Sequence, residues 1–263
     1  MHTREEKLKA FGETLDVLDT LREKCPWDRK QTNESLRPNT IEEVYELCDA
    51  LIADDNPNIC KELGDVLLHV AFYSKIGEEK GEFDIADVCE RLNRKLIFRH
   101  PHIYGDVSAE TPEQVAGNWE KLKQREKDGN KSVLGGVPAA LPALIKANRI
   151  QEKARNVGFD WEKKEDVWAK VKEEISEVEA EISRDDTDKA RIDEEFGDLL
   201  FAVINAARLY GVDPENALEH TNRKFIARFN HIERTLKEGG RTFGDVTLAE
   251  MDEIWNEAKK LDN

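Results

Sequence analysis

Two helical segments that carry paired carboxylates occur twice in this chain. The first half contains IEEVYELCDALI at residues 41–52 and KELGDVLLHV at residues 61–70, and the second half contains VKEEISEVEAEI at residues 171–182 and EEFGDLLFAV at residues 194–203. Apolar residues recur in them at spacings of three and four, the period of an amphipathic helix. Glu43 and Glu174 are 131 residues apart, and Asp65 and Asp198 are 133 residues apart. Ordered repeats at nearly constant spacing predict tandem copies of one domain.

Shorter matches extend the repeat on both sides. They are KLIFR (95–99) with KFIAR (224–228), WEKLK (119–123) with WNEAK (255–259), and YGDVS (104–108) with FGDVT (243–247). Glycine and proline gather near the midpoint of the chain, which is typical of a linker. We therefore expect an all-α protein with one domain over residues 1–128, a linker over 129–142 and a second domain over 143–263.

The composition restricts the function classes. The chain has 263 residues, 39% hydrophobic and 37% charged, with a formal net charge of −16. An acidic surface does not suit nucleic-acid binding, because phosphate backbones require basic surfaces. There is no apolar run of about 18 residues that would predict a membrane span. Four cysteines without metal-type spacing are expected to be free thiols in a reducing cytoplasm.

The repeated carboxylates predict a metal site in each half. Residues three apart share one face of a helix, so two facing helices would bring four carboxylates together. Oxygen-only ligation, without histidine or cysteine, suits Mg²⁺, with Mn²⁺ as a substitute. The alternative is a solvated acidic face, which the repetition disfavours. A glycine before each aspartate predicts either close helix approach or access to the metal. The predicted ligands are Glu174, Glu177, Glu195 and Asp198, with equivalents Glu43, Glu46, Glu62 and Asp65.

Basic and aromatic residues recur in the same way. Cations four residues apart on a helix could bind phosphate oxygens, or could form surface ion pairs of little energetic value. A tryptophan followed by a lysine one turn later could contact a nucleoside, or the tryptophan could be core. The candidates are Lys224, Arg228, Trp255 and Lys259, with N-terminal equivalents Lys95, Arg99, Trp119 and Lys123.

In this order, the motifs resemble the MazG nucleoside triphosphate pyrophosphohydrolases. CPWD from Cys25 and LPALIKANRIQEKARNVGFDW from Leu141 strengthen the resemblance, which covers essentially the whole chain. It implies two tandem all-α domains with four-helix-bundle-like cores, usually in a dimer or a higher-order assembly. It also implies Mg²⁺-dependent hydrolysis of nucleoside triphosphates to the monophosphate and pyrophosphate, with broad specificity or clearance of aberrant nucleotides, and an association with growth-arrest control.

The C-terminal copy is the expected main catalyst. Its carboxylates would hold Mg²⁺, and a water would attack the α-phosphorus while pyrophosphate leaves. Lys170 precedes Glu174 by one turn, where the first copy has Asn39, and adds a cation near the phosphates. The resemblance points to the same copy. The N-terminal copy keeps its carboxylates and could be a weaker site, a regulatory site or a scaffold.

Three other functions fit parts of the sequence less well. A di-iron carboxylate bundle would need Glu-x-x-His pairs, whereas the pairs here are ExxE and ExxD. A non-catalytic nucleotide-binding regulator would share the site but release no pyrophosphate. A purely structural helical protein would not need to repeat these carboxylates and cations in register.

Overall fold

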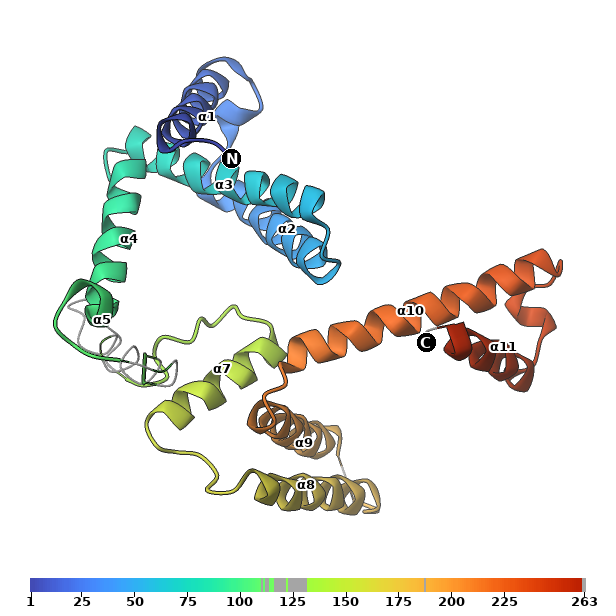
Figure 1. The fold of residues 1–263 in the computed structure, drawn as a ribbon. Coiled ribbons are helices and arrows are strands. Elements are labelled where there is room, and N and C mark those ends of the chain that lie inside the picture. The colour runs from blue at the N-terminus through green and yellow to red at the C-terminus, as the bar shows by residue number, and fades with distance from the viewer. Residues whose placement is uncertain (110, 112–113, 116–121, 123–131, 187, 262–263) are drawn as a thin grey trace. The chain divides into compact units, whose positions relative to one another are not determined.

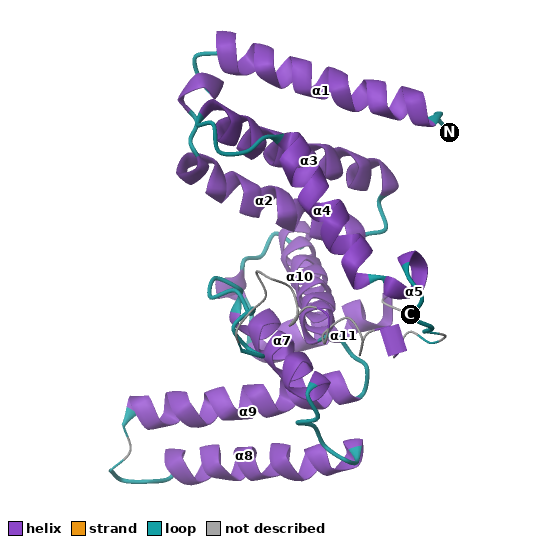
Figure 2. Ribbon diagram, turned by 90° about the vertical axis from the view of Figure 1, so that its left-hand side faces the viewer, coloured by secondary structure: helices purple, strands orange, loops and turns teal. Residues whose placement is uncertain are grey.

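The computed structural model describes residues 1–109, 111, 114–115, 122, 132–186 and 188–261. The chain divides into two compact units, residues 1–115 and 116–263 (Figure 1). The described residues form ten α-helices and short 3₁₀ turns, and none of them belongs to a β-strand (Figure 2). The predicted all-α class is confirmed.

The first unit is built on a helical hairpin. Helix α2 (Asn33–Ile52) packs along α3 (Asn56–Glu79), and both α1 (Arg4–Lys24) and α4 (Ile85–Arg99) contact α3. A short helix, α5 (Pro101–Tyr104), follows α4. Thr32 caps α2 by accepting a hydrogen bond from the backbone N–H of Ser35, which fixes where this helix begins. The core between α1 and this hairpin is formed by Leu18, Leu36, Ala71, Phe72 and Ile76.

The second unit contains an equivalent hairpin. Helix α8 (Val167–Ile182) packs along α9 (Lys189–Leu209), and α7 (Ala143–Asn156) packs against α9. Asp188 caps α9, with the backbone N–H of Arg191 donating to Oδ1 at 3.0 Å. The hairpin core is formed by Val167, Val171, Ala202 and Ala206. Helix α10 (Pro214–Glu238) and α11 (Leu248–Leu261) pack on each other around Ile232, Leu236 and Ile254.

The glycines beside the predicted metal ligands do not serve helix packing within the described chain. A Cβ atom added at Gly64 or Gly197 would meet no atom within 4 Å. Close approach of a neighbouring described helix, one of the two expected reasons for these glycines, is therefore wrong. Open space beside the carboxylates agrees with the other reason, access to the site.

Three further observations bear on what the sequence led us to expect. No described helix has the length and apolar character needed to cross a membrane. Cys25, Cys48, Cys60 and Cys89 are all free, as their spacing predicted. The first three residues of the predicted linker, 129–131, lie outside the described part of the chain.

Candidate metal and nucleotide site

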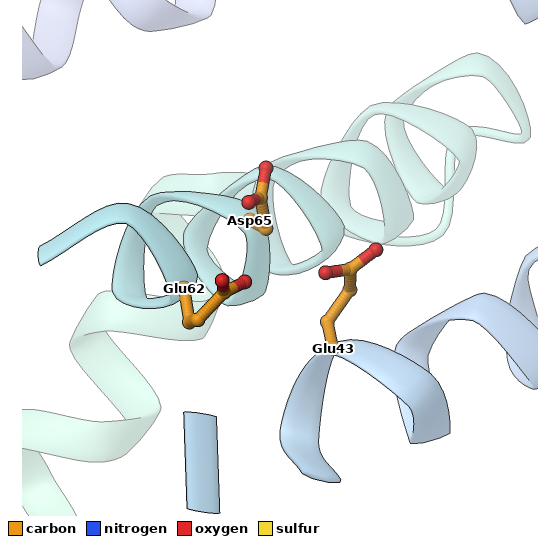
Figure 3. A group of neighbouring side chains, drawn as sticks. All are labelled: Glu43, Glu62 and Asp65. Carbon is orange, nitrogen blue, oxygen red and sulfur yellow. The ribbon is translucent and has the colours of Figure 1, made fainter. Parts of the chain in front are cut away.

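In the first unit, carboxylates from α2 and α3 converge. Glu43 comes from α2, and Glu62 and Asp65 come from successive turns of α3 (Figure 3). One oxygen of each lies within 4.8 Å of one oxygen of the others. Glu46, predicted as the fourth member, lies outside this described group, and its Oε2 is 3.9 Å from Lys61 Nζ.

The second unit repeats the arrangement between α8 and α9. Oxygens of Glu174, Glu177 and Glu195 lie within 4.8 Å of one another. The predicted fourth carboxylate, Asp198, is exposed on α9 and lies outside the described group. Each hairpin therefore unites three of its four predicted ligands.

Each group has one buried glutamate, and a lysine ammonium group forms an ion pair with one of its carboxylate oxygens. Glu174 is 4% exposed, and its Oε1 lies 2.6 Å from Lys170 Nζ. Glu62 is also 4% exposed, and its Oε1 lies 2.8 Å from Lys61 Nζ. In both residues Oε2 is buried and has no hydrogen-bond partner among the described residues.

The two units use different helices for this glutamate. Glu174 lies on the first helix of its hairpin, whereas Glu62 lies on the second helix of its own. Lys61 is a cation that the sequence analysis missed. Glu194 stands at the equivalent position of the second unit, so the lysine does not recur in the repeat. Each site therefore has three carboxylates, but the two sites differ in which helix of the hairpin supplies the lysine.

The pKa values of two of these carboxylates are raised. For Glu43, burial raises the pKa first, followed by repulsion from Asp65, Glu46 and Glu62. For Glu177, a side-chain hydrogen bond shared with Glu174 raises the pKa, and burial and repulsion from Glu174 add to it. Each carboxylate group thus favours a bound proton or a cation.

The donor set fits a hard divalent cation. All donors are carboxylate oxygens, and no described histidine or cysteine joins either group. A buried carboxylate oxygen without a partner is costly, and a cation would satisfy it. The two carboxylate groups, Glu43–Glu62–Asp65 and Glu174–Glu177–Glu195, can therefore bind metal ions.

The predicted basic and aromatic residues of the second unit lie on α10 and α11, and two of them, Arg228 and Trp255, are in contact. The Arg228 guanidinium carbon lies 5.5 Å from the centroid of the Trp255 ring, and the Phe225 centroid lies 5.0 Å from it. Lys224 is exposed on α10, and Lys259 is exposed on the last turn of α11. Among the described residues, the lysine paired with Glu174 is Lys170.

The N-terminal equivalents are only partly described. Lys95 and Arg99 lie four residues apart near the end of α4. Trp119 and Lys123 lie outside the described residues.

Sequence reasoning missed a polar group near the C-terminal end of α9. Arg208 Nη2 on α9 donates to Asp160 Oδ1 at 2.5 Å, and Arg208 also donates to Asn205 Oδ1 from Nε and Nη2 at 3.1 and 2.7 Å. The GFDW segment at residues 158–161 gave a partial signal, but its partner lies 48 residues away in the sequence.

The chain is similar to known proteins over nearly its whole length. The MazG nucleotide pyrophosphohydrolase domain matches it twice, over residues 31–104 and 162–233. The nucleoside triphosphate pyrophosphohydrolase/pyrophosphatase MazG of Thermotoga maritima is 43% identical over 252 residues, which cover 95% of each chain. The nucleoside triphosphate pyrophosphohydrolase of Escherichia coli K12 is 41% identical over 258 residues, covering 96% of this chain and 98% of that protein. Uncharacterized protein YabN of Bacillus subtilis is 45% identical over 264 residues, covering 98% of this chain and 54% of that protein. With two domain matches in the predicted order, this chain belongs to the MazG nucleotide pyrophosphohydrolase family.

Proposed function

We propose that this protein is a nucleoside triphosphate pyrophosphohydrolase, which converts a nucleoside triphosphate and water into the monophosphate and pyrophosphate. The observation that carries the proposal is the group of Glu174, Glu177 and Glu195, with Lys170 on one oxygen of Glu174. The names of the relatives support the same reaction. The substrates are nucleoside triphosphates, ATP among them, with broad base specificity or a preference for aberrant nucleotides.

The cofactor in this proposal is Mg²⁺, which Mn²⁺ can replace. Held by Glu174, Glu177 and Glu195, it would neutralise triphosphate charge and polarise the α-phosphorus. Asp198, one turn from Glu195 on α9, is the fourth carboxylate proposed for the site. Lys170 is half-buried beside Glu174, so its ammonium group can bind phosphate oxygens that approach the carboxylates.

The C-terminal unit is proposed as the main catalyst. Its lysine enters from α8, one turn before Glu174, whereas Lys61 enters the first unit from α3 beside Glu62. Because the first unit retains Glu43, Glu62 and Asp65 in one group, we propose that it keeps a weaker or regulatory nucleotide site.

The group on α10 and α11 is proposed to bind phosphate. Arg228 lies against Trp255, so the ring positions the guanidinium group by a cation–π contact. Lys224 and Lys259 supply further positive charge. Their equivalents Lys95, Arg99, Trp119 and Lys123 are proposed to serve the first unit in the same way.

A homodimer is part of the proposal. Apolar side chains on the α8–α9 hairpin are too exposed for a solvated surface, with Leu200 at 59%, Ile182 at 53% and Phe196 at 44%. A two-helix hairpin buries one apolar face only, and a second copy of the chain would cover the rest. The four free cysteines suit the reducing cytoplasm as the working compartment.

Product analysis tests the reaction. The full chain is incubated with Mg²⁺ and ATP, dTTP or dITP, and nucleotide and phosphate products are separated. Equal amounts of monophosphate and pyrophosphate are expected. Diphosphate and orthophosphate would indicate a different phosphatase. Nucleotide binding without any product would indicate the non-catalytic regulator.

A further inference from the structure

The first unit has a polar network where the second unit has apolar core. Oγ1 of Thr40 on α2 lies 2.9 Å from Nδ1 of His69 and 2.6 Å from the hydroxyl oxygen of Tyr73, both on α3. We call these three side chains the Thr40 network. The equivalent positions of the second unit are all apolar and belong to its hairpin core: Val171, Ala202 and Ala206. The network is therefore a difference between two otherwise repeated hairpins.

The hydroxyl group of Thr40 can satisfy all its partners in one arrangement only. It donates its single proton to the backbone carbonyl of Leu36 at 3.0 Å, because a carbonyl can only accept. Tyr73 must then donate its own proton to Thr40, and His69 must donate from Nδ1. Burial lowers the pKa of His69 against an opposing effect of the Asp65 charge, so the ring is neutral at neutral pH. The network thus fixes both the orientation and the tautomer of His69.

The Thr40 network lies beside the carboxylate group of the first unit. Thr40 precedes Glu43 by three residues on α2, and His69 follows Asp65 by four residues on α3. Residues three or four apart share one face of a helix, so the network and the carboxylates occupy neighbouring turns of the contact between α2 and α3. The hydrogen bonds therefore join the two helices one turn away from Glu43 and from Asp65.

The two carboxylate groups differ in membership at this end of the hairpin. In the first unit, Asp65 is a member (Figure 3), and Glu46 lies outside the described group. In the second unit the choice is reversed, because Glu177 is a member and Asp198 lies outside the described group. The hairpin with the polar network thus includes the aspartate next to it, and the hairpin with small apolar residues leaves its aspartate exposed.

We propose that the Thr40 network positions Asp65 for cation binding in the first unit. By joining α3 to α2 beside Asp65, it holds this carboxylate against Glu43 and Glu62. The inference rests on the proposed function, which treats this group as a cation site, and the buried Oε2 of Glu62, without a partner among the described residues, supports that use. Ligands that are fixed before binding lose less conformational freedom, so the cation binds more tightly. Thr40 is a positioning residue, because it acts through Asp65.

Substitutions in the network test this role. Thr40→Val removes the hydroxyl group and introduces the residue type of the second unit, and Tyr73→Phe removes the other hydroxyl group while keeping the ring. Thr40→Ser keeps the hydroxyl group. Ser74→Ala is the matched control, because Ser74 is 3% exposed and its hydroxyl donates to Val70 within α3 at 2.8 Å. Each is made in the full chain carrying Glu174→Gln, which weakens the second group, and Mn²⁺ binding without nucleotide is measured by electron paramagnetic resonance.

Thr40→Val is expected to raise the Kd of Mn²⁺ about tenfold, the scale expected when a group that orients a metal ligand is lost. Tyr73→Phe should raise it in the same direction. Thr40→Ser and Ser74→Ala should leave it unchanged. Asp65→Asn should also raise the Kd, and adding Thr40→Val to it should have no further effect, because the two residues act in series.

An unchanged Kd in both Thr40→Val and Tyr73→Phe would overturn the proposal. An equal rise in Ser74→Ala or Thr40→Ser would also overturn it, because general loss of packing would then explain the effect. Independent losses from Thr40→Val and Asp65→Asn would contradict a role through Asp65. These titrations involve no turnover. If the wild type makes no pyrophosphate, the proposed function fails, and Mn²⁺ binding still decides the role of Thr40.

Discussion

The ammonium group of Lys170 lies 2.6 Å from Oε1 of Glu174, on the same face of α8. This pair places a cation at the entrance to three carboxylates that would otherwise repel one another. The Glu174 carboxylate raises the Lys170 pKa, chiefly through their hydrogen bond, so Lys170 stays charged throughout the physiological range. In the first unit, the lysine on the buried glutamate comes from the other helix of the hairpin.

The first prediction concerns this lysine. Lys170→Met keeps the apolar stem and removes the charge. Because a charged hydrogen bond to phosphate is lost, KM for ATP should rise by about tenfold. Mg²⁺ should bind more tightly in the absence of nucleotide, because a competing cation has gone. Calorimetry and steady-state kinetics measure the two effects, which have opposite signs.

Lys61→Met is the matched variant for the first unit. It should alter Mg²⁺ binding there and leave turnover near the wild-type rate. An unchanged KM in Lys170→Met would show that this lysine does not contact the substrate.

The second prediction concerns protons released by metal binding. The Glu177 pKa is raised above 4.5, mainly through its hydrogen bond with Glu174, so near pH 5 the free protein holds more protons than isolated glutamates would. Mg²⁺ requires ionised ligands, so its affinity should rise with pH through this range, and binding should release protons. Calorimetry in two buffers of different ionisation enthalpy measures that release.

Glu177→Gln provides the control for proton release. It should reduce the release near pH 5, and the difference between the two proteins should shrink as the pH rises and Glu177 ionises in the free protein. Release that is equal in both proteins at the lower pH would assign the raised pKa to another group, with Glu43 the next candidate.

The third prediction concerns the Asp160–Arg208 ion pair. Asp160→Asn leaves the nearly buried Arg208 charge without its partner and should cost about 2 kcal/mol in the free energy of unfolding at neutral pH. Burial acts to raise the Asp160 pKa, but the hydrogen bond from Arg208 and further favourable contacts lower it below 3.8. The contribution is therefore present above pH 3.8 and is lost as the pH falls through the lower folded-state pKa.

Urea denaturation at several pH values measures this difference in stability. Asp186→Asn serves as the control, because its ion pair with Arg184 is exposed and should contribute little. Equal effects of the two substitutions would mean that Asp160 has no special structural role.

The fourth prediction concerns the apolar face of α8 and α9. Leu200→Glu introduces a charge at a side chain that is 59% exposed, so a monomer should tolerate it. If a second copy covers this face, the substitution should convert a dimer into a monomer, as measured by sedimentation. Leu8→Glu on α1, at 61% exposed, is the control. A dimer that persists in Leu200→Glu would place the interface elsewhere.

Much of this architecture could be predicted from the sequence. Helical periodicity located both hairpins, because buried apolar residues must recur on one face of each helix. The repeat identified the carboxylates, since a solvated face has no reason to recur in register. By contrast, the hydroxyl group of Thr40 forms partly buried hydrogen bonds with His69 and Tyr73. This network could not be found from the repeat, because Ala202 stands at the position equivalent to His69.

Other features depend on tertiary geometry. Glu195 and Asp198 are equally good ligands in the sequence, yet among the described residues Glu195 joins Glu174 and Glu177 whereas Asp198 stays exposed outside the group, although the equivalent Asp65 joins the group of the first unit. The ion pair between Asp160 and Arg208 joins residues 48 apart in the sequence, which local periodicity does not encode. Lys61 and Lys170 lie at non-equivalent positions, with Glu194 and Asn39 in the other copy, so neither lysine recurs in the repeat.

The most direct test compares product formation by the wild type, Glu174→Gln, Glu43→Gln and the double variant, with Mg²⁺ and a panel of nucleoside triphosphates. We expect Glu174→Gln to lose monophosphate and pyrophosphate production, and Glu43→Gln to stay near the wild-type rate. Comparable partial losses in the two single variants would mean two working sites. Loss in Glu43→Gln alone would contradict the assignment of catalysis to the C-terminal unit.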